Sequence, residues 1–281
     1  MKGDLHCHSK LSDGSQGIED IIAMSKKMNL NFVAITDHDT MSSHSRAKIV
    51  GDRYGVQIIP AVEFSAFDYQ RGRRVHILCY MPLKPDRLEG MCIKICESRK
   101  KSGNEMAKKV MKLFPISPES ITRHSASSKS VYKQHIMHAL MEAGFTTGIY
   151  GPLYDKLFHP EQGSCYVETE YPDVYEVLNL IHSSGGIAVF AHPHIYNSFD
   201  LLQELCEKRL IDGIEVWHGK ATQDDEAQLH QMCDTYHLIP TGGSDFHGMY
   251  SSRPAHIGKC TTPNESIEAL FALNEEIKKS M

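Results

Sequence analysis

The sequence predicts an α/β protein, a TIM-like barrel with a mainly helical insertion. Short apolar, β-branched runs alternate with amphipathic stretches of helical period in the first third of the chain, and the same rhythm returns after residue 170. The runs are apolar throughout rather than every second residue, which is typical of parallel strands covered on both faces. About seven such strands in one chain favour a closed barrel.

In the first third of the chain we expect two strand–helix–strand units, followed by one direct strand-to-strand connection. Apolar residues at Ile18, Ile21, Ile22 and Met28 recur at helical spacing, whereas the run from Phe32 to Thr36 is apolar and β-branched. We expect strands over 4–8, 32–36, 57–63 and 75–79, and helices over 18–28 and 47–54.

The last part of the chain repeats this alternation. Runs such as Ile187 to Ala191 and Gly213 to Trp217 are continuous and apolar, and amphipathic segments separate them. We expect strands over 187–191, 213–217 and 239–242, helices over 174–181, 201–206 and 267–277, and a helix that ends at Tyr236.

Residues 88–166 interrupt the rhythm. This segment contains a basic helical stretch from Lys94 to Lys112, two prolines at Pro115 and Pro118, and a polar run that includes Ser125 to Ser130. We expect a helical subdomain that caps the substrate site, inserted into a barrel formed by residues 1–87 and 167–281.

Composition excludes several classes of protein. The 281 residues carry a net charge of −5 and 41% hydrophobic residues, which is typical of a globular protein rather than a disordered or coiled-coil one. We expect no membrane-spanning segment, no secretion signal and no long nucleic-acid track. Eight cysteines without a CxxC pair indicate reduced thiols, so we expect a cytoplasmic protein.

Histidines and acids gather where the expected strands end. The chain has 17 histidines, and these positions lie on or just after a strand: His6, His8, Asp37, His38, Asp39, Glu63, His76, His192, Asp245 and His247. Barrel strands end on one shared face, so these residues are expected to form one site. His6 and His8 are two apart on a strand and point the same way, which suits two imidazoles on one cation.

The chemistry of this set favours a metal centre. A carboxylate such as Glu63 could bridge two ions about 3.5–4 Å apart, as in binuclear hydrolases. Histidines together with carboxylates select Zn, Mn or Fe over Ca, and Mg is a further alternative. Each histidine alone would more often be structural, but a complete set reverses that expectation.

In this order, the motifs resemble one family. The motifs are Asp4-Leu5-His6-Cys7-His8-Ser9, Ser12-Asp13-Gly14, Ile35-Thr36-Asp37-His38-Asp39-Thr40, Glu63, His76, Ala191-His192-Pro193 and Gly243-Ser244-Asp245-Phe246-His247. The chain is identified as a member of the PHP (polymerase and histidinol phosphatase) metal-dependent phosphoesterases. It is most similar to the stand-alone nucleoside 3′,5′-bisphosphate phosphatases, some of which also trim RNA from its 5′ end.

The resemblance implies a distorted (β/α)7 barrel and two or three divalent ions. It places one ion on His6, His8, Glu63 and Asp245. It places a second on Asp13, His38 and His247. It has Glu63 bridge to a third ion, held also by His76 and His192.

The expected reaction is hydrolysis of a phosphomonoester by metal-activated hydroxide. Clustered cations neutralise the phosphate and lower the pKa of bound water, so no protein nucleophile is needed. Asp37 and Asp39 could orient His38 or accept its proton. His194 or His218 could protonate the leaving oxygen.

Substrate recognition is expected at the insertion and near the last ligands. The candidates for a phosphate that the metals do not bind are Lys129, Lys133 and Arg253, with His135 as a further substrate contact. Relatives often read His-Pro-x-Arg-Tyr where this chain reads His192 to Tyr196, so an arginine is absent there. For His124 and His138 we expect structural roles, with His135 and His138 on a helix of the insertion.

Three alternatives stay open at this point. The enzyme could act on nucleoside 3′,5′-bisphosphates, on oligonucleotide 5′ ends, or on histidinol phosphate. A nucleic-acid-binding PHP module is disfavoured by the net charge. A barrel without catalytic activity is disfavoured because the ligand set is complete.

Overall fold

The computed structural model describes residues 1–252 and 255–281 and has an α/β fold. The α/β class is therefore confirmed. The strands are β1 (Lys2–Cys7), β2 (Phe32–Ile35), β3 (Gln57–Ile58), β4 (Ala61–Asp68), β5 (Arg73–Tyr80), β6 (Ile187–Phe190), β7 (Gly213–His218), β8 (Ile239–Gly243) and β9 (Thr262–Pro263).

These strands form two mixed sheets. The first has the order β3-β2-β1-β9, in which β1, β2 and β3 run parallel and β9 pairs antiparallel with β1. The second has the order β4-β5-β6-β7-β8, in which only the β6-β7 and β7-β8 pairs are parallel. A closed seven-stranded barrel is not confirmed among the described residues.

The β4–β5 hairpin is the main difference from the expected parallel sheet. Both strands have eight residues and pair antiparallel in continuous register from Ala61–Tyr80 to Asp68–Arg73. The turn between them is only four residues long, and Gly72 there has a φ of 68°. So short a connection leaves no room for the crossover that parallel strands require.

Helices cover the sheets along the chain. They are α1 (Ile18–Lys27), α2 (His44–Tyr54), α7 (Val174–Ser183), α8 (Phe199–Glu207), α9 (Gln223–Tyr236) and α10 (Asn264–Ser280). Their apolar faces are buried at helical spacing, for example Ile18, Ile21 and Ile22 in α1. Sequence periodicity therefore predicted each of these helices within a few residues.

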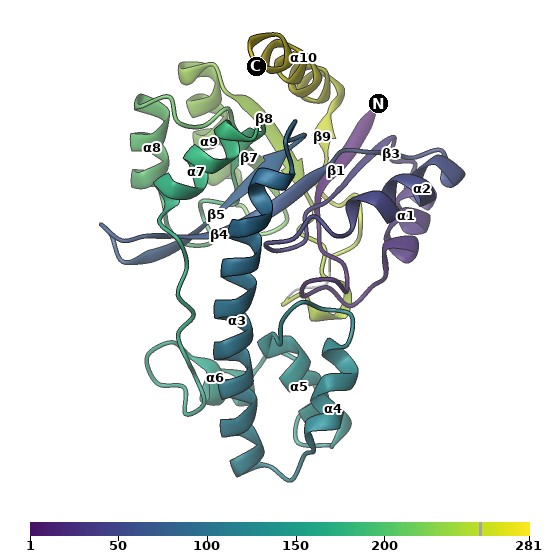
Figure 1. Cartoon of the computed structure of the whole chain (residues 1–281), viewed down its shortest axis with the longest axis vertical. Coiled ribbons are helices and arrows are strands. Elements are labelled where there is room, and N and C mark those ends of the chain that lie inside the picture. Colours follow the sequence, from purple (N-terminus) through teal and green to yellow (C-terminus); the bar gives the residue numbers. More distant parts are fainter. Residues whose placement is uncertain (253–254) are drawn as a thin grey trace.

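The remaining helices lie between β5 and α7. They are α3 (Asp86–Leu113), α4 (Pro118–Ser125), α5 (Lys133–Glu142) and α6 (Pro152–Phe158), and we call α4–α6 the cap. In Figure 1 the 28-residue α3 runs away from the sheets and the cap lies around its far end, opposite both chain termini. Leu140, Phe158 and their neighbours form a separate small core in the cap. The division of the chain at residues 88 and 166 stays a prediction.

The two sheets meet along strands that carry the candidate ligands. Cys7 on β1 forms an isolated bridge with Phe246 beyond β8, and His38 beyond β2 forms one with Glu63 on β4. A Cβ added at Gly243 would lie 2.4 Å from the backbone nitrogen of His6. Glycine at position 243 therefore lets β8 approach β1 closely.

Two further findings concern the whole described chain. No helix in residues 1–252 or 255–281 is both long and apolar enough to span a membrane. All eight cysteines are unpaired, and most are buried.

We predict that Gly243→Ala lowers the free energy of unfolding by about 1–3 kcal/mol, because the new methyl group overlaps the backbone of β1. Urea denaturation followed by circular dichroism measures the change. Gly90→Ala is the matched control, since a Cβ at this exposed helical position meets nothing within 4 Å and should be neutral or stabilising. Equal stability of Gly243→Ala and wild type would contradict the close approach.

Candidate metal centre

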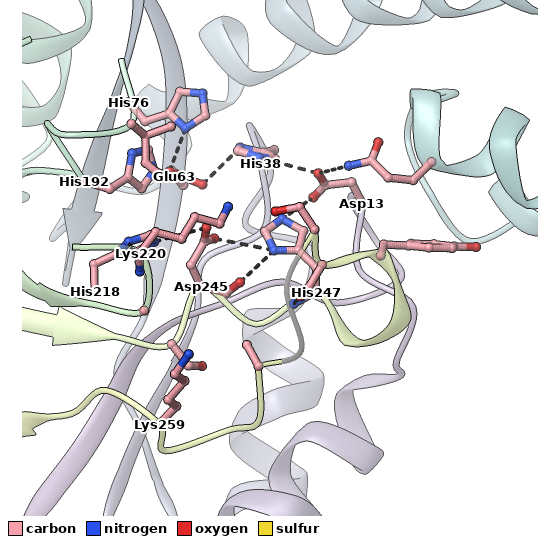
Figure 2. Close-up of a pocket in the computed structure, with 18 of the residues that line it drawn as sticks. Asp13, His38, Glu63, His76, His192, His218, Lys220, Asp245, His247 and Lys259 are labelled. Atoms are coloured by element: carbon pink, nitrogen blue, oxygen red, sulfur yellow. Dashed lines mark hydrogen bonds and ion pairs between the residues drawn. The ribbon is translucent and has the colours of Figure 1, made fainter. Parts of the chain in front are cut away.

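The nine residues proposed as ligands surround one cavity of about 250 Å³ (Figure 2). Seven of them line the cavity, and His6 and His8 lie fully buried beneath it. They come from β1, β4, β5 and the segments that follow β1, β2, β6 and β8. The structure thus brings together residues that are up to 241 positions apart in sequence, from His6 to His247.

Glu63 lies at the middle of the set. Its Oε1 is 2.8 Å from Nδ1 of His76 and 2.9 Å from Nε2 of His192. Its Oε2 lies 3.3 Å from His6, 3.1 Å from His8 and 3.2 Å from His38. One buried carboxylate therefore contacts five imidazoles, as a bridging ligand would.

Asp245 and Asp13 complete two further groups. Oδ1 of Asp245 is 3.5 Å from Nε2 of His6 and 3.3 Å from Nε2 of His8. Asp13 lies 3.3 Å from His247, 3.7 Å from His8 and 3.8 Å from His38. His8 therefore lies between two groups, one formed by His6, Glu63 and Asp245 and the other by Asp13, His38 and His247.

The carboxylates of this site are balanced by imidazoles. Burial would raise the pKa values of Asp13, Glu63 and Asp245, but the surrounding histidines hold all three well below their usual range. Burial would lower the pKa of His8, but Asp245, Glu63 and Asp13 raise it to about 10. The pKa of His6 is also raised well above its usual value, because the negative charges of nearby carboxylates, with Glu215 as the strongest, outweigh the effect of burial.

Several side-chain nitrogen and oxygen atoms of this cluster are buried and have no hydrogen-bond partner. They are Nδ1 of His8, Oδ1 of Asp13, Nδ1 of His38 and Nδ1 of His192. Within the described residues, no lysine or arginine forms an ion pair with Asp13, Glu63 or Asp245. Unsatisfied buried acceptors without a basic partner fit divalent cations, and the nitrogen and carboxylate donors suit Zn, Mn or Fe.

The backbone at three strand ends takes a conformation that is rare outside glycine. The φ angles are 55° at Asp39, 27° at His192 and 48° at Asp245. Such angles cost free energy in residues with a Cβ and are found where the fold enforces a functional geometry. Here they lie beside or within the cluster.

The hydrogen bonds of Asp37 and Asp39 differ from the expectation that these residues orient His38. Asp37 instead accepts bonds from Ser9 and from the Ser12 hydroxyl, each at 2.7 Å, and so fixes the loop that leads to Asp13. Asp39 accepts from the backbone and hydroxyl of Ser65 and pairs with the buried Arg99. Both carboxylates position neighbouring loops rather than the imidazole of His38.

His194 and His218 lie next to each other at one side of the cavity. Nε2 of His194 is 2.9 Å from Nδ1 of His218, and Nε2 of His218 is 3.3 Å from Asp245. Only His218 is among the residues that line the cavity. Burial and the neighbouring imidazole of His218 lower the pKa of His194 to about 4, so it is neutral at pH 7. His218 is therefore the better-placed proton donor of the two.

The four expected substrate residues fall in different places. Lys133 lines a second cavity of about 220 Å³, which shares Asp13, His38 and His76 with the first. Lys129 lines a separate hollow beside α3, so the structure does not support its expected role at this site. His135 is buried, and its Nδ1 accepts a bond from the backbone of Tyr132, which makes it a structural residue of α5. Arg253 lies outside the described residues.

Sequence reasoning missed two residues of the site. Glu215 on β7 accepts from Nδ1 of His6 at 2.7 Å and from the backbone of His192 at 2.9 Å. The sequence does indicate Glu215, because it is a single acidic residue inside an otherwise apolar predicted strand. Arg74 lines the second cavity, and its signal was a position two residues before His76 on the same strand face.

The comparisons with known proteins agree with this geometry. A family model described as PHP domain matches residues 4–187, which is more than half of the chain. The chain belongs to the PHP domain family. The resemblance found in the sequence is therefore confirmed.

Two curated PHP relatives and one solved structure are close to the chain. A phosphoribosyl 1,2-cyclic phosphate 1,2-diphosphodiesterase of Eggerthella lenta is 34% identical over 92% of this chain and 98% of its own length. A 3′,5′-nucleoside bisphosphate phosphatase of Chromobacterium violaceum is 27% identical over 87% and 86%. The crystal structure of an inferred metal-dependent phosphoesterase from Bifidobacterium adolescentis has a TM-score of 0.85, with 24% identity over 96% of each chain, and shows the shared fold.

We predict that Glu63→Gln removes bound metal and lowers phosphoesterase turnover at least about 100-fold, because the amide cannot bridge two cations as a carboxylate does. Metal content after purification and phosphate release measure the two effects. Glu89→Gln, an exposed change on α3, is the control. Full metal content and turnover in Glu63→Gln would refute the bridging role.

We predict that metal loading releases at least one proton per chain near pH 7 and that apparent affinity rises with pH. The pKa values of His6 and His8 are raised and their Nε2 atoms lie 3.1 Å apart, so the pair holds at least one proton that the cation must displace. Calorimetric titration with Zn²⁺ or Mn²⁺ in buffers of different ionisation enthalpy counts these protons. A heat of binding that is independent of the buffer would contradict this charge assignment.

Proposed function

We propose that this PHP protein is a metal-dependent phosphoesterase whose substrate carries a second phosphoryl group. The observation that supports the hydrolytic centre is the contact of Glu63 with five imidazoles between two further carboxylates. His6, His8, Glu63 and Asp245 would hold one ion, Asp13, His38 and His247 a second, and Glu63, His76 and His192 a third. Two or three divalent ions would thus lie beneath the cavity.

Divalent ions held by these residues would neutralise a phosphate and supply hydroxide at neutral pH for in-line attack on phosphorus. The chain itself would provide charge and protons around that step. Lys220 and Lys259 line the same cavity and would attract an anionic substrate. His218 would protonate the leaving oxygen through Nε2, because its Nδ1 accepts the backbone N–H of Lys220 at 3.2 Å and lies beside Nε2 of His194.

The second cavity supports a site for a phosphoryl group that is not hydrolysed. Arg74 is half-buried there, and its guanidinium donates to the hydroxyl of Tyr166 at 3.0 Å. Among the described residues, no carboxylate pairs with Arg74 or with Lys133. Burial and the charge of Arg74 lower the pKa of Lys133 to about 8, which leaves most of it protonated at pH 7. A phosphate would supply the missing negative charge.

The names of the relatives support the same substrate class. One acts on a phosphoribosyl cyclic phosphate and the other on a nucleoside bisphosphate, and each name specifies a phosphorylated sugar with two phosphoryl positions. Tyr132, Tyr154, Tyr171 and Tyr196 line the second cavity and suit the stacking or hydrogen bonding of a sugar or base. We therefore place nucleoside 3′,5′-bisphosphates and sugar cyclic phosphates ahead of histidinol phosphate.

Two wider expectations accompany this proposal. The net charge of −5 disfavours a long nucleic-acid track, so an oligonucleotide would be engaged only at its 5′ end. Eight unpaired cysteines favour a reducing compartment such as the cytoplasm.

We predict that Arg74→Met raises KM for adenosine 3′,5′-bisphosphate or a phosphoribosyl cyclic phosphate about 10–100-fold. A charged hydrogen bond to phosphate contributes about 1.5–3 kcal/mol, and methionine fills the space without the charge. Turnover of p-nitrophenyl phosphate should stay within about threefold, because that ester has no second phosphoryl group. Phosphate release across both kinds of substrate measures the difference.

Arg53→Met, an exposed change on α2, is the matched control for the arginine substitution. An equal loss on both kinds of substrate would refute the second-phosphate site while leaving the metal chemistry intact. Preference of the wild type for histidinol phosphate over every bisphosphate and cyclic phosphate would refute the substrate class. Absence of turnover with added Mn, Zn and Mg would refute the proposed phosphoesterase activity.

A further inference from the structure

A second group of side chains whose spacing could hold a metal ion lies on the cap, apart from the cavity residues. It consists of His124 on α4 and His138 and Glu142 on α5. His138 and Glu142 are one helical turn apart and share a face, and α4 packs against that face. Their donor atoms all lie within 4.8 Å of one another.

The two imidazoles converge on one carboxylate. Nε2 of His124 is 3.1 Å from Oε2 of Glu142, and Nε2 of His138 is 4.0 Å from Oε1. The two rings stack with centroids 3.7 Å apart and an interplanar angle of 19°, so one ring has to rotate before both Nε2 lone pairs can point at the same ion. Tetrahedral ligands at about 2.1 Å from a zinc ion are separated by about 3.4 Å, which falls within this spread.

The environment of each histidine matches that of a ligand rather than of a packed core residue. Nε2 of His124 is buried and without a hydrogen bond, because the nearby Glu142 oxygen lies outside hydrogen-bond geometry. The other ring nitrogen of His138, Nδ1, lies 2.8 Å from the hydroxyl of Tyr250. Metal-binding histidines commonly use the second nitrogen in this way, which fixes the ring and directs Nε2 toward the ion.

The protonation state of His138 and the exposure of Glu142 leave both side chains able to bind a cation. Burial and the neighbouring imidazole of His124 lower the pKa of His138, so the ring is available in its neutral, ligating form. Arg123 contacts Glu142 at 3.6 Å, but its side chain is 70% exposed and can move into solvent. Glu142 is itself 43% exposed, which leaves an open side for water as a fourth ligand.

We propose that His124, His138 and Glu142 bind a divalent transition-metal ion of the Zn²⁺ type on the cap. Two imidazoles, one carboxylate and a water form a common zinc coordination set. The ion would join α4 to α5. Through His138 and Tyr250 it would also connect the cap to the segment that follows His247, a ligand of the proposed catalytic centre. This site does not depend on the proposed phosphoesterase function.

The test uses the full-length protein with the central cluster disabled by Asp13→Asn, Glu63→Gln and Asp245→Asn, which together remove a carboxylate from each proposed ion, so that the cap can be measured alone. The protein is stripped with a chelator, titrated with Zn²⁺, and its bound zinc is counted by elemental analysis. We expect about one zinc per chain. Addition of His138→Gln should abolish this binding, whereas the matched change His159→Gln, at an exposed histidine of the same segment, should leave it unchanged.

Glu142→Gln provides a second variant that does not threaten the fold, because the residue is half-exposed. We expect it to weaken zinc binding at least about tenfold. Co²⁺ bound in place of zinc should give visible absorption bands that disappear in His138→Gln. No zinc bound by the background protein, or binding that is insensitive to both His138→Gln and Glu142→Gln, would overturn the proposal.

Discussion

The structure depends on one electrostatic constraint, the burial of Glu63 among five imidazoles with Asp13 and Asp245 beside them. Buried carboxylates are costly unless a positive charge balances them. The raised pKa values of His6 and His8 indicate that protonated imidazole balances part of this charge, and divalent ions would take its place. The strand ends, the close approach at Gly243 and the left-handed backbone at His192 and Asp245 all serve to hold these donors together.

Residues around the ligands make this arrangement rigid. Asp37 fixes the loop after β1 through Ser9 and Ser12, and Glu215 orients His6 through its second ring nitrogen. The buried pair of Asp39 and Arg99 connects the loop after β2 to α3. The helix that carries the cap is thereby anchored close to the metal centre, so the position of the cap and the geometry of the ligands are linked.

The sequence predicted the α/β class, and it selected the histidines and acids that the structure brings to one cavity, because hydrophobic period and strand position are local signals. His6 and His8 lie at the end of β1 as expected, whereas Glu63 lies within β4 and not at the end of a strand over 57–63. The antiparallel β4–β5 hairpin was missed because continuous apolar runs do not record strand direction. Lys129 lies in a separate hollow, His135 is buried in α5, and Arg74 was not considered, because which basic residues face the cavity depends on tertiary packing. Charge alone could not choose among several basic residues.

The most direct test of the metal centre is anomalous diffraction from crystals of the protein loaded with Mn²⁺. The account predicts two or three anomalous peaks within bonding distance of the donor atoms, with at least two peaks sharing Glu63 as a ligand. The distance between those two ions should be about 3.5–4 Å. An absence of peaks at the cluster, or a single ion that does not touch Glu63, would contradict the account.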